Sequence, residues 1–546
     1  MIASWSQGWR PYAVLTLLCL GLYLPGMSAL PVMDRDEARF AQATRQMIES
    51  GDYLRIRFQD EARNRKPAGI YWLQALSVSA LSDAASTAIW PYRLPSLLGA
   101  LGAVLLTFGL GRSLVGAPAA LLGAALLASS LTLVAEAHLA KTDAVLLACA
   151  ASAQFAFATI YCRSQAGRRA DWRWALLFWA AVALGTLIKG PVVPLLALLT
   201  GLTLAAADRE ARWLKDLRMP WGILLCVAIV GPWLYLISRA TSGAFLGQSL
   251  GQDFFGKLIG AQESHSAPPG SYLLLLALSF WPGSLFLAPG LWRGWRERAE
   301  PAQRFLLAWI VPFWAVLEVI PTKLPHYLLP AYPALALLAA AALVKGVRRP
   351  AWLDIASALL WGAASLALAA ALVMAPRKLG DSFSAMGIIV ALVLLVGSGA
   401  LIRRALRARS GDGETLAAGA ALLALIVLVP VFALVTPGLD ALWVSRGAAS
   451  LVAPLRQPGH AVAVAGYSEP SLIFLLGTDT KLVDGAAAAE FLVADPTAIV
   501  LIEGRAEGGF RRAAEEAELT PREIGRVAGL DYSNGRLTVL TLYTGR

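Results

Sequence analysis

The sequence predicts a mainly α-helical, polytopic membrane protein with a small α/β domain at its C-terminal end. Of its 546 residues, 57% are hydrophobic and only 15% are charged, and the mean hydropathy is +0.61. Soluble domains carry about 25% charged residues, so the deficit implies that lipid surrounds much of the chain. Apolar runs near the roughly 20 residues that a span needs recur up to residue 436, and the composition changes after residue 441.

About thirteen apolar runs have the character of transmembrane helices. The first lacks a small-residue cleavage site, so we interpret it as a retained span rather than a signal peptide. A very tight hairpin, Lys189-Gly190-Pro191, separates the fifth run from the sixth. The runs lie at residues 11–30, 91–111, 117–134, 139–161, 174–188, 190–207, 220–238, 272–292, 304–320, 326–344, 352–374, 385–402 and 415–436.

Basic residues set the predicted orientation. Arginines and lysines gather in the short loops that follow even-numbered runs, at residues 163–173, 209–218, 293–304, 345–349 and 403–409. By the positive-inside rule these loops are cytoplasmic, which places the N-terminus inside. The same distribution explains the net charge of +11 without a nucleic-acid partner.

Two long loops then face outward, at residues 31–90 and 239–271. In the first, Phe40, Ala43 and Met47 follow a helical period that ends near Gly51, which predicts a short helix lying on the membrane. A second interfacial helix is predicted from Ile70 to Leu81, with aromatic side chains at headgroup depth.

The tail alternates short β-type runs with helix-like stretches. The runs are residues 461–465, 481–484 and 498–503, and the helical stretches are 486–493 and 510–518. This alternation predicts a small α/β domain. We therefore divide the chain into a membrane domain, residues 1–440, and a soluble outward-facing domain, residues 441–546.

An acidic pair opens the first interfacial helix, directly after the first span. Asp36 and Glu37 fit two interpretations. Acidic residues are common in the first turn of a helix, where the helix dipole favours them. Alternatively, Asp36 is a general base, because a carboxylate within hydrogen-bond reach of a hydroxyl can accept its proton.

Cations and further polar groups accumulate on the same predicted side of the membrane. Each one alone fits a residue that contacts headgroups or extends its charge toward water. Together they form a set that could hold an anionic, lipid-linked substrate, since lysine and arginine bind phosphate well. The set comprises Arg63, Arg65, Lys66, Asp143, Lys189, Lys323, His326 and Tyr327.

A metal site is the weaker hypothesis for the outward loops. His265 could bind a divalent ion together with Glu263 or Glu37, but these residues lack a reliable ligand spacing. The alternative is an ordinary loop histidine. No other cofactor is predicted.

Several short motifs resemble the bacterial aminoarabinose-transferase-like and protein O-mannosyltransferase superfamily of membrane glycosyltransferases, which has the GT-C fold. Their order and spacing extend through most of the membrane part. The motifs are Asp36-Glu37-Ala38-Arg39-Phe40-Ala41, Ser50-Gly51-Asp52-Tyr53, Lys66-Pro67-Ala68-Gly69-Ile70-Tyr71-Trp72, Asp143, Thr186-Leu187-Ile188-Lys189-Gly190, Gly231-Pro232-Trp233, His265-Ser266-Ala267-Pro268 and Lys323-Leu324-Pro325-His326-Tyr327.

The resemblance implies an enzyme of the bacterial inner membrane that transfers a sugar from a polyprenyl phosphate carrier, such as undecaprenyl phosphate, with inversion. It implies catalysis by Asp36 and donor-phosphate binding by Lys66, Lys189 and Tyr327, with Arg63 or Arg65. Glu37, Asp143, Lys323 and His326 would support them. The active site and the C-terminal domain would be periplasmic. The acceptor would be lipid A of the lipopolysaccharide or another envelope glycan.

Two positions depart from the aminoarabinose branch. Arg65 stands where that branch has a glutamate, and Ser266 stands where it has an arginine. We therefore keep a transferase acting on protein or on another glycan as an alternative. A flippase or transporter of lipid-linked sugars is the alternative from a different class. It predicts charges deep in several spans and repeated halves, and neither is evident in the sequence.

Overall fold

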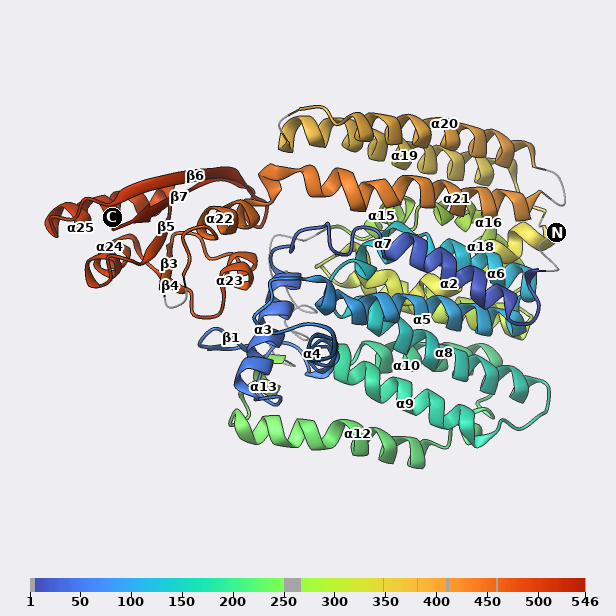
Figure 1. Ribbon diagram of the computed structural model, residues 1–546. Coiled ribbons are helices and arrows are strands. Elements are labelled where there is room, and N and C mark those ends of the chain that lie inside the picture. Colours follow the sequence, from blue (N-terminus) through green and yellow to red (C-terminus); the bar gives the residue numbers. More distant parts are fainter. Residues whose placement is uncertain are drawn as a thin grey trace.

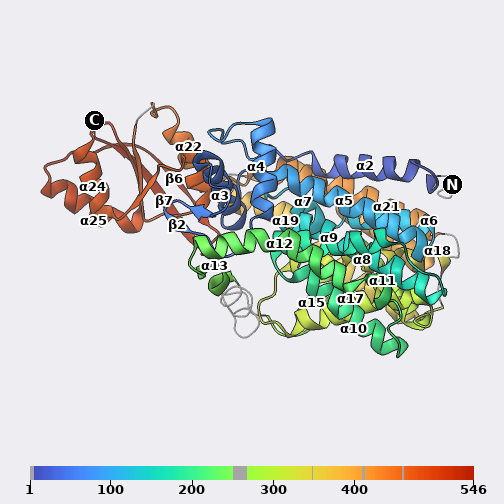
Figure 2. The same cartoon turned by 90° about the horizontal axis from the view of Figure 1, so that it is seen from below.

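The structure is a helix bundle with an α/β domain attached at one end (Figure 1). It is a computed structural model that describes residues 5–249, 267–346, 348–380, 382–408, 412–457 and 460–545. Both views place the N-terminus at the end of the bundle that lies opposite this domain (Figure 2). The predicted fold class, a mainly α-helical membrane protein with a small C-terminal sheet, is confirmed.

Within the described residues, nine helices are long and apolar enough to cross a membrane. Helices α6 (Ala117–Ala128) and α7 (Leu131–Ala137) give a tenth crossing if they count as one span bent by 61°. The count of thirteen stays a prediction. The nine are α5 (Trp90–Leu114), α8 (Asp143–Gln165), α9 (Trp172–Lys189), α11 (Leu214–Leu217) with α12 (Met219–Ala240), α17 (Pro301–Val319), η3 (Pro325–Ala331) with α18 (Tyr332–Lys345), α19 (Ala351–Leu379), α20 (Ala385–Arg407), and α21 (Gly413–Pro430) with the turns up to Gly438.

Besides the bent pair α6 and α7, two further predicted spans differ from continuous helices. The run at 11–30 contains only α2 (Arg10–Tyr23), which ends before Pro25 and Gly26. The run at 272–292 divides into α15 (Ser271–Ser279), η2 (Gly283–Phe286) and α16 (Leu287–Arg296). The prediction of one unbroken helix there was therefore wrong. The interruption falls at Pro282, because proline removes a backbone donor and clashes with the preceding turn. The hairpin before α10 (Val192–Asp208) is as tight as predicted.

The first long loop lies where the bundle meets the α/β domain (Figure 1). It holds α3 (Asp36–Ser50) and α4 (Gly69–Leu81), which confirms both predicted helices. Gly51 ends α3 in the left-handed conformation that glycine adopts readily. A small antiparallel pair, β1 (Arg57–Phe58) and β2 (Glu61–Ala62), fills the connection.

A buried ion pair fixes the start of α3 against the bundle. Arg93, in α5, donates through Nε and Nη2 to the two oxygens of Glu37, at 2.8 and 2.9 Å. Its remaining donors reach the carbonyl oxygens of Met27, Leu30 and Pro31. Glu37 also accepts from the backbone N–H groups of Met33 and Ala140. Since neither side chain is more than 1% exposed, the pair is desolvated and fully hydrogen-bonded.

The C-terminal domain is built on a five-stranded sheet in the order β4-β3-β5-β7-β6. The three predicted strands are present as β3 (Val462–Ala465), β4 (Lys481–Val483) and β5 (Ile499–Glu503). The antiparallel strands β6 (Arg522–Asp531) and β7 (Arg536–Thr544) were missed. In the case of β6, the reason is that it is a largely exposed edge strand with little apolar signal. The domain's helices are α22 (Val444–Val452), α23 (Pro470–Leu476), α24 (Gly485–Ala494) and α25 (Gly504–Glu516).

Three carboxylates approach one another where this domain meets the first loop. Asp34 accepts a hydrogen bond from the Ser471 N–H at 3.1 Å, and Glu469 accepts one from the Ser533 hydroxyl at 2.9 Å. The pKa of Asp34 is raised to about 6, mainly by burial; the hydrogen bonds from Ser471 oppose the rise, and the charge of Asp531 adds to it. Burial, followed by the charge of Asp34, raises the pKa of Glu469 to about 7.

We expect removal of Arg93 to destabilise the protein strongly. Arg93→Leu leaves the Glu37 carboxylate buried without its partner, and breaking such a pair costs about 3–5 kcal/mol. Thermal unfolding in detergent measures the loss. The control is Arg55→Ala, which removes an exposed partner of Asp52 and should cost less than about 1 kcal/mol. Equal losses in the two variants would contradict the stabilising role of the buried pair.

We expect the junction between the two domains to loosen as the pH rises. In the folded protein Asp34 and Glu469 have pKa values above their ordinary 3.8 and 4.5, so the folded state holds protons more tightly. Their contribution is therefore most favourable below those ordinary values and is lost as the pH rises through about 6 and 7. Hydrogen exchange of residues 31–36 and 467–472 between pH 5 and 8 measures this change. The variant Asp34→Asn with Glu469→Gln should flatten it, and an unchanged pH dependence would refute it.

Candidate functional site

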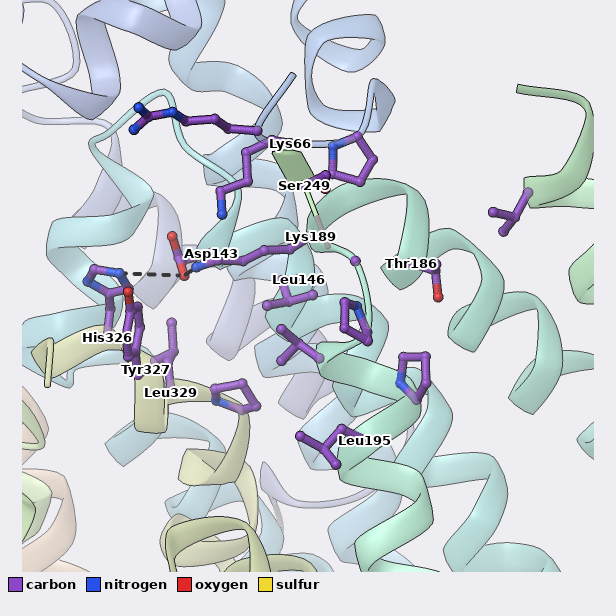
Figure 3. A pocket seen from close by; sticks show the side chains of 18 of the residues that line it. Lys66, Asp143, Leu146, Thr186, Lys189, Leu195, Ser249, His326, Tyr327 and Leu329 are labelled. Atoms are coloured by element: carbon purple, nitrogen blue, oxygen red, sulfur yellow. Dashed lines mark hydrogen bonds and ion pairs between the residues drawn. The ribbon is translucent and has the colours of Figure 1, made fainter. Parts of the chain in front are cut away.

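A cavity of about 340 Å³ opens among the membrane helices near the first loop. Polar side chains from distant segments gather on part of its wall, and Figure 3 shows Lys66, Asp143, Lys189, His326 and Tyr327 there. Apolar side chains from the bundle form the rest. They include Leu146, Val192, Leu195, Val230, Trp233, Leu234, Phe313 and Leu317. The cavity is therefore amphipathic, with a charged part and a longer apolar part.

The charged part is centred on Asp143, the first residue of α8. Its carboxylate accepts a hydrogen bond from Lys189 Nζ at 2.5 Å, so the end of α9 is joined to the start of α8. His326 Nε2 lies 3.9 Å from the same carboxylate, on the opposite side (Figure 3). Lys189 Nζ also lies 5.5 Å from the centre of the Tyr327 ring, which is within reach of a cation–π contact.

A second ion pair lies behind this group. Lys141 Nζ bonds to Glu136 Oε1 at 3.0 Å, and His326 Nδ1 is 3.7 Å from that oxygen. Glu136 is buried, and its other oxygen has no partner among the described residues. His326 is thus flanked by two carboxylates, each of which is paired with a lysine. Lys141 lies in the short connection between α7 and α8, two residues before Asp143.

Asp36 is the exposed first residue of α3 and lies close to these cations. Partial removal of water by the surrounding protein acts to raise the pKa of Asp36. The positive charges of Lys141, Arg63 and Lys189 outweigh this desolvation, so the pKa of Asp36 is lowered. Asp36 is therefore an ionised carboxylate at neutral pH. An ionised, solvent-accessible carboxylate next to a cavity can accept a proton from a bound hydroxyl.

The connector before α4 brings three cations to the same region. Lys66 and Arg65 line the cavity, and Arg63 lies over the Phe40 ring at 5.4 Å. Arg63 Nε donates to the Tyr71 hydroxyl at 3.2 Å, which holds the guanidinium beside α3. These positions bring the predicted phosphate-binding residues into one neighbourhood, although their roles stay predictions.

Some predicted residues have other surroundings. Lys323 is buried, and its ammonium donates to the carbonyl oxygens of Glu318 and Ile320 at 2.9 and 2.8 Å, which caps the end of α17. Glu37 uses both oxygens on Arg93 and two backbone N–H groups, so its geometry does not favour a metal ligand. His265 and Glu263 lie outside the described residues. Among the residues that are described, no group of three His, Cys, Asp or Glu side chains is placed to hold a metal.

Two residues of this region were missed in the sequence. Glu136 falls in the short connection between the apolar runs 117–134 and 139–161, and Arg93 falls near the start of the run 91–111; both are buried in the structure. A charged residue within or directly beside an apolar run was the available signal, because such residues are costly in a membrane and need a partner or a function. Their partners, Lys141 and Glu37, are close in space to the residues that the motifs had indicated.

Comparison with known proteins identifies related sequences. The dolichyl-phosphate-mannose-protein mannosyltransferase family model matches residues 65–236. The undecaprenyl phosphate-α-4-amino-4-deoxy-L-arabinose arabinosyl transferase of Pseudomonas paraeruginosa is 30% identical over 376 residues, which are 67% of this chain and 66% of that protein. The enzyme of the same name from Yersinia pestis is 27% identical and shares 60% of this chain and 58% of its own length. The matched part of the chain thus corresponds to between 58% and 66% of the length of these relatives.

The fold has a solved counterpart of similar extent. The crystal structure of ArnT from Cupriavidus metallidurans bound to undecaprenyl phosphate superposes with a TM-score of 0.74, and 97% of each chain is covered. The sequence identity is 18%, so this likeness concerns the fold. It includes both the helix bundle and the C-terminal domain.

We expect Lys141 to keep Asp36 ionised. Lys141→Met removes the positive charge that lowers the pKa of Asp36 most strongly, so the pKa should rise. Infrared difference spectra against pH, with Asp36→Asn used to assign the band, measure the titration. The control Lys481→Met changes an exposed lysine of β4 and should leave the band unmoved. An unshifted titration in Lys141→Met would show that other charges set the pKa.

Proposed function

We propose that the chain belongs to the aminoarabinose-transferase-like branch of the GT-C membrane glycosyltransferases and that it transfers a sugar from a polyprenyl phosphate carrier to an acceptor in the cell envelope. The observation that carries this proposal is the amphipathic cavity, which combines lysines with a long apolar wall. A polyprenyl phosphate has the same two parts, an anionic head and an apolar tail.

The charged end of the cavity fits the carrier phosphate. Lys66 and Lys189 line it, and an ammonium group has three donors, so the bond from Lys189 to Asp143 leaves capacity for a phosphate oxygen. Asp143 would hold Lys189 in place, and Tyr327 would shield it from the side. Arg65 at the rim would add a forked donor set. Their combined charge would stabilise the leaving phosphate as the bond to the sugar breaks.

The transfer is a displacement at the anomeric carbon. The oxygen of an acceptor hydroxyl attacks that carbon, and Asp36 takes the hydroxyl proton. The bond between the anomeric carbon and the phosphate oxygen breaks, and its electrons leave with the polyprenyl phosphate. A single displacement inverts the configuration of the anomeric carbon. These bond changes balance without a nucleotide sugar.

We further propose that the site faces the periplasm of a bacterial inner membrane. The basic loops favour a cytoplasmic N-terminus. The first loop and the C-terminal domain lie at the opposite end of the bundle, which supports their placement outside (Figure 2). The donor would then be reached from the outer leaflet.

The nature of the sugar and of the acceptor is the open part of the proposal. The names of the related arabinosyl transferases support an undecaprenyl phosphate carrier and an amino sugar as the donor group. Lipid A as the acceptor follows only from the resemblance in the sequence motifs. Arg65 in place of a carboxylate favours a donor sugar without an ammonium group, because like charges repel. Protein and other glycans stay alternative acceptors. Mass spectrometry of envelope lipids, glycans and proteins with and without this protein distinguishes these acceptors.

We expect Asp36→Asn to lower the transfer rate by roughly 10²–10⁴-fold, the usual contribution of a general base. Transfer of labelled sugar from polyprenyl phosphate in proteoliposomes measures the rate. The control is Asp52→Asn, which changes a partly exposed carboxylate of the same loop that is bonded to Arg55. Undiminished transfer by Asp36→Asn would end the assignment of Asp36, and transport of the intact donor without transfer would favour a flippase.

A further inference from the structure

Helix α3 has two opposite faces that contact different parts of the molecule. One face carries Asp36, Phe40, Ala43 and Met47, and the last three of these belong to the core of the bundle. At 3.6 residues per turn, residues 38, 41, 42, 45 and 49 lie about 140–240° around the helix from Asp36. That second face contacts the C-terminal domain. The helix that bears Asp36 is therefore held between the two domains.

The apolar part of this contact is made by Phe474 of α23. Its side chain is fully buried in a cluster with Ala38 and Ala41 of α3 and with Tyr92 of α5. The Phe474 and Tyr92 rings meet edge to face at 5.4 Å. On the other side of α23, Leu472 and Leu476 belong to the core of the C-terminal domain itself. This short helix thus joins the sheet of its own domain to α3.

Polar contacts extend along the whole of the second face. Arg45, 3% exposed, donates to the Phe474 carbonyl at 2.6 Å and to the Ala84 and Ala85 carbonyls before α5. Gln42 Nε2 donates to the Thr478 hydroxyl at 2.8 Å, and that hydroxyl donates to Glu49 at 2.8 Å.

The chain just before α3 is also held by this domain. The Asp34 N–H donates to the Tyr532 hydroxyl at 2.6 Å, and Arg35 donates to the Ser533 carbonyl. The bonds therefore begin two residues before Asp36 and continue to the end of the helix.

We propose that the C-terminal domain acts as a clamp that sets the position of Asp36, with Phe474 and Thr478 as positioning residues for the transfer reaction. This inference rests on the proposed function and adds a role for residues 441–546. The C-terminal domain contacts α3 on the face opposite to Asp36, and the Arg93–Glu37 pair holds the first turn of α3 from the bundle side. Small displacements of a reacting group have large effects on rate, so the contact matters for catalysis.

The clamp predicts a specific kinetic defect. Phe474→Ala should lower kcat by roughly 10- to 100-fold. The KM for the donor should change little, because Lys66 and Lys189 hold the phosphate from other elements. Phe474→Leu should recover most of the rate, and Thr478→Val, which removes the bonds to Gln42 and Glu49 without creating a large cavity, should show a smaller fall in kcat.

The matched control is Phe510→Ala. Phe510 is also a fully buried phenylalanine of the C-terminal domain, but it packs on Tyr543 on the other face of the sheet. Its loss should destabilise the domain while leaving kcat of the folded protein near the wild-type value. Equal losses of kcat in the two variants, or an unchanged kcat in both Phe474→Ala and Thr478→Val, would overturn the proposal.

A second measurement separates the clamp from the proposed function. Hydrogen exchange of residues 36–50 should become faster in Phe474→Ala and Thr478→Val, and it should stay at the wild-type rate in Phe510→Ala. This readout needs no substrate. If the wild-type protein transfers no sugar from any polyprenyl phosphate donor, the proposed function fails, while the exchange rates still decide whether the clamp exists. Unchanged exchange in the first two variants would refute it.

Discussion

The structure around the site depends on the buried pair between Arg93 and Glu37. A charged group in the apolar interior is tolerated only when its hydrogen-bonding capacity is satisfied. All five donors of Arg93 are used on Glu37 and on three carbonyl groups between the first span and α3. Glu37 in turn accepts the N–H of Ala140, directly before Lys141. This one interaction fixes the segment after α2, the start of α3 and the loop before α8 relative to α5.

Because Glu37 follows Asp36 directly, the same pair determines where Asp36 lies. Asp36 lies close enough to Lys141 and Lys189 for their charges to lower its pKa, and these lysines are themselves held by carboxylates, Lys141 by Glu136 and Lys189 by Asp143. Ion pairs of this kind limit the movement of each side chain. The arrangement separates two tasks, an accessible carboxylate that accepts a proton and less accessible cations that hold an anion.

The C-terminal domain gives the first loop a second support. A helix at a membrane surface that is held only on its bundle side would be free to tilt about that contact. Burial of Phe474 and the bonds of Arg45 oppose such motion from the outer side. The domain has no catalytic motif that we can identify among the described residues, yet it contacts the helix that bears the proposed general base along its length. A structural contribution to catalysis is consistent with this arrangement.

The sequence by itself determined the membrane class, most helix positions and the neighbourhood of the site. These follow from local properties, since apolar runs, turn residues and short motifs can be recognised one segment at a time. Asp36, Lys66, Asp143, Lys189 and His326 could be proposed because their motifs mark an outward loop or the end of a span. The break at Pro282 and the edge strand β6 were missed, because an apolar run conceals a kink and an exposed strand lacks an apolar pattern.

Only the tertiary structure decided which charges are paired. Arg93 with Glu37, Lys141 with Glu136 and Lys323 with the carbonyl groups at the end of α17 are contacts between side chains and distant or irregular backbone. Such pairing depends on how helices pack and bend, and the spacing of residues along the chain does not contain it. The same holds for the second face of α3, whose small and polar residues look like an exposed surface until α23 covers them. The local sequence therefore determines which chemical groups are present near the site, and packing determines which of them pair. Desolvated charges are stable only in the arrangement that satisfies all of them together.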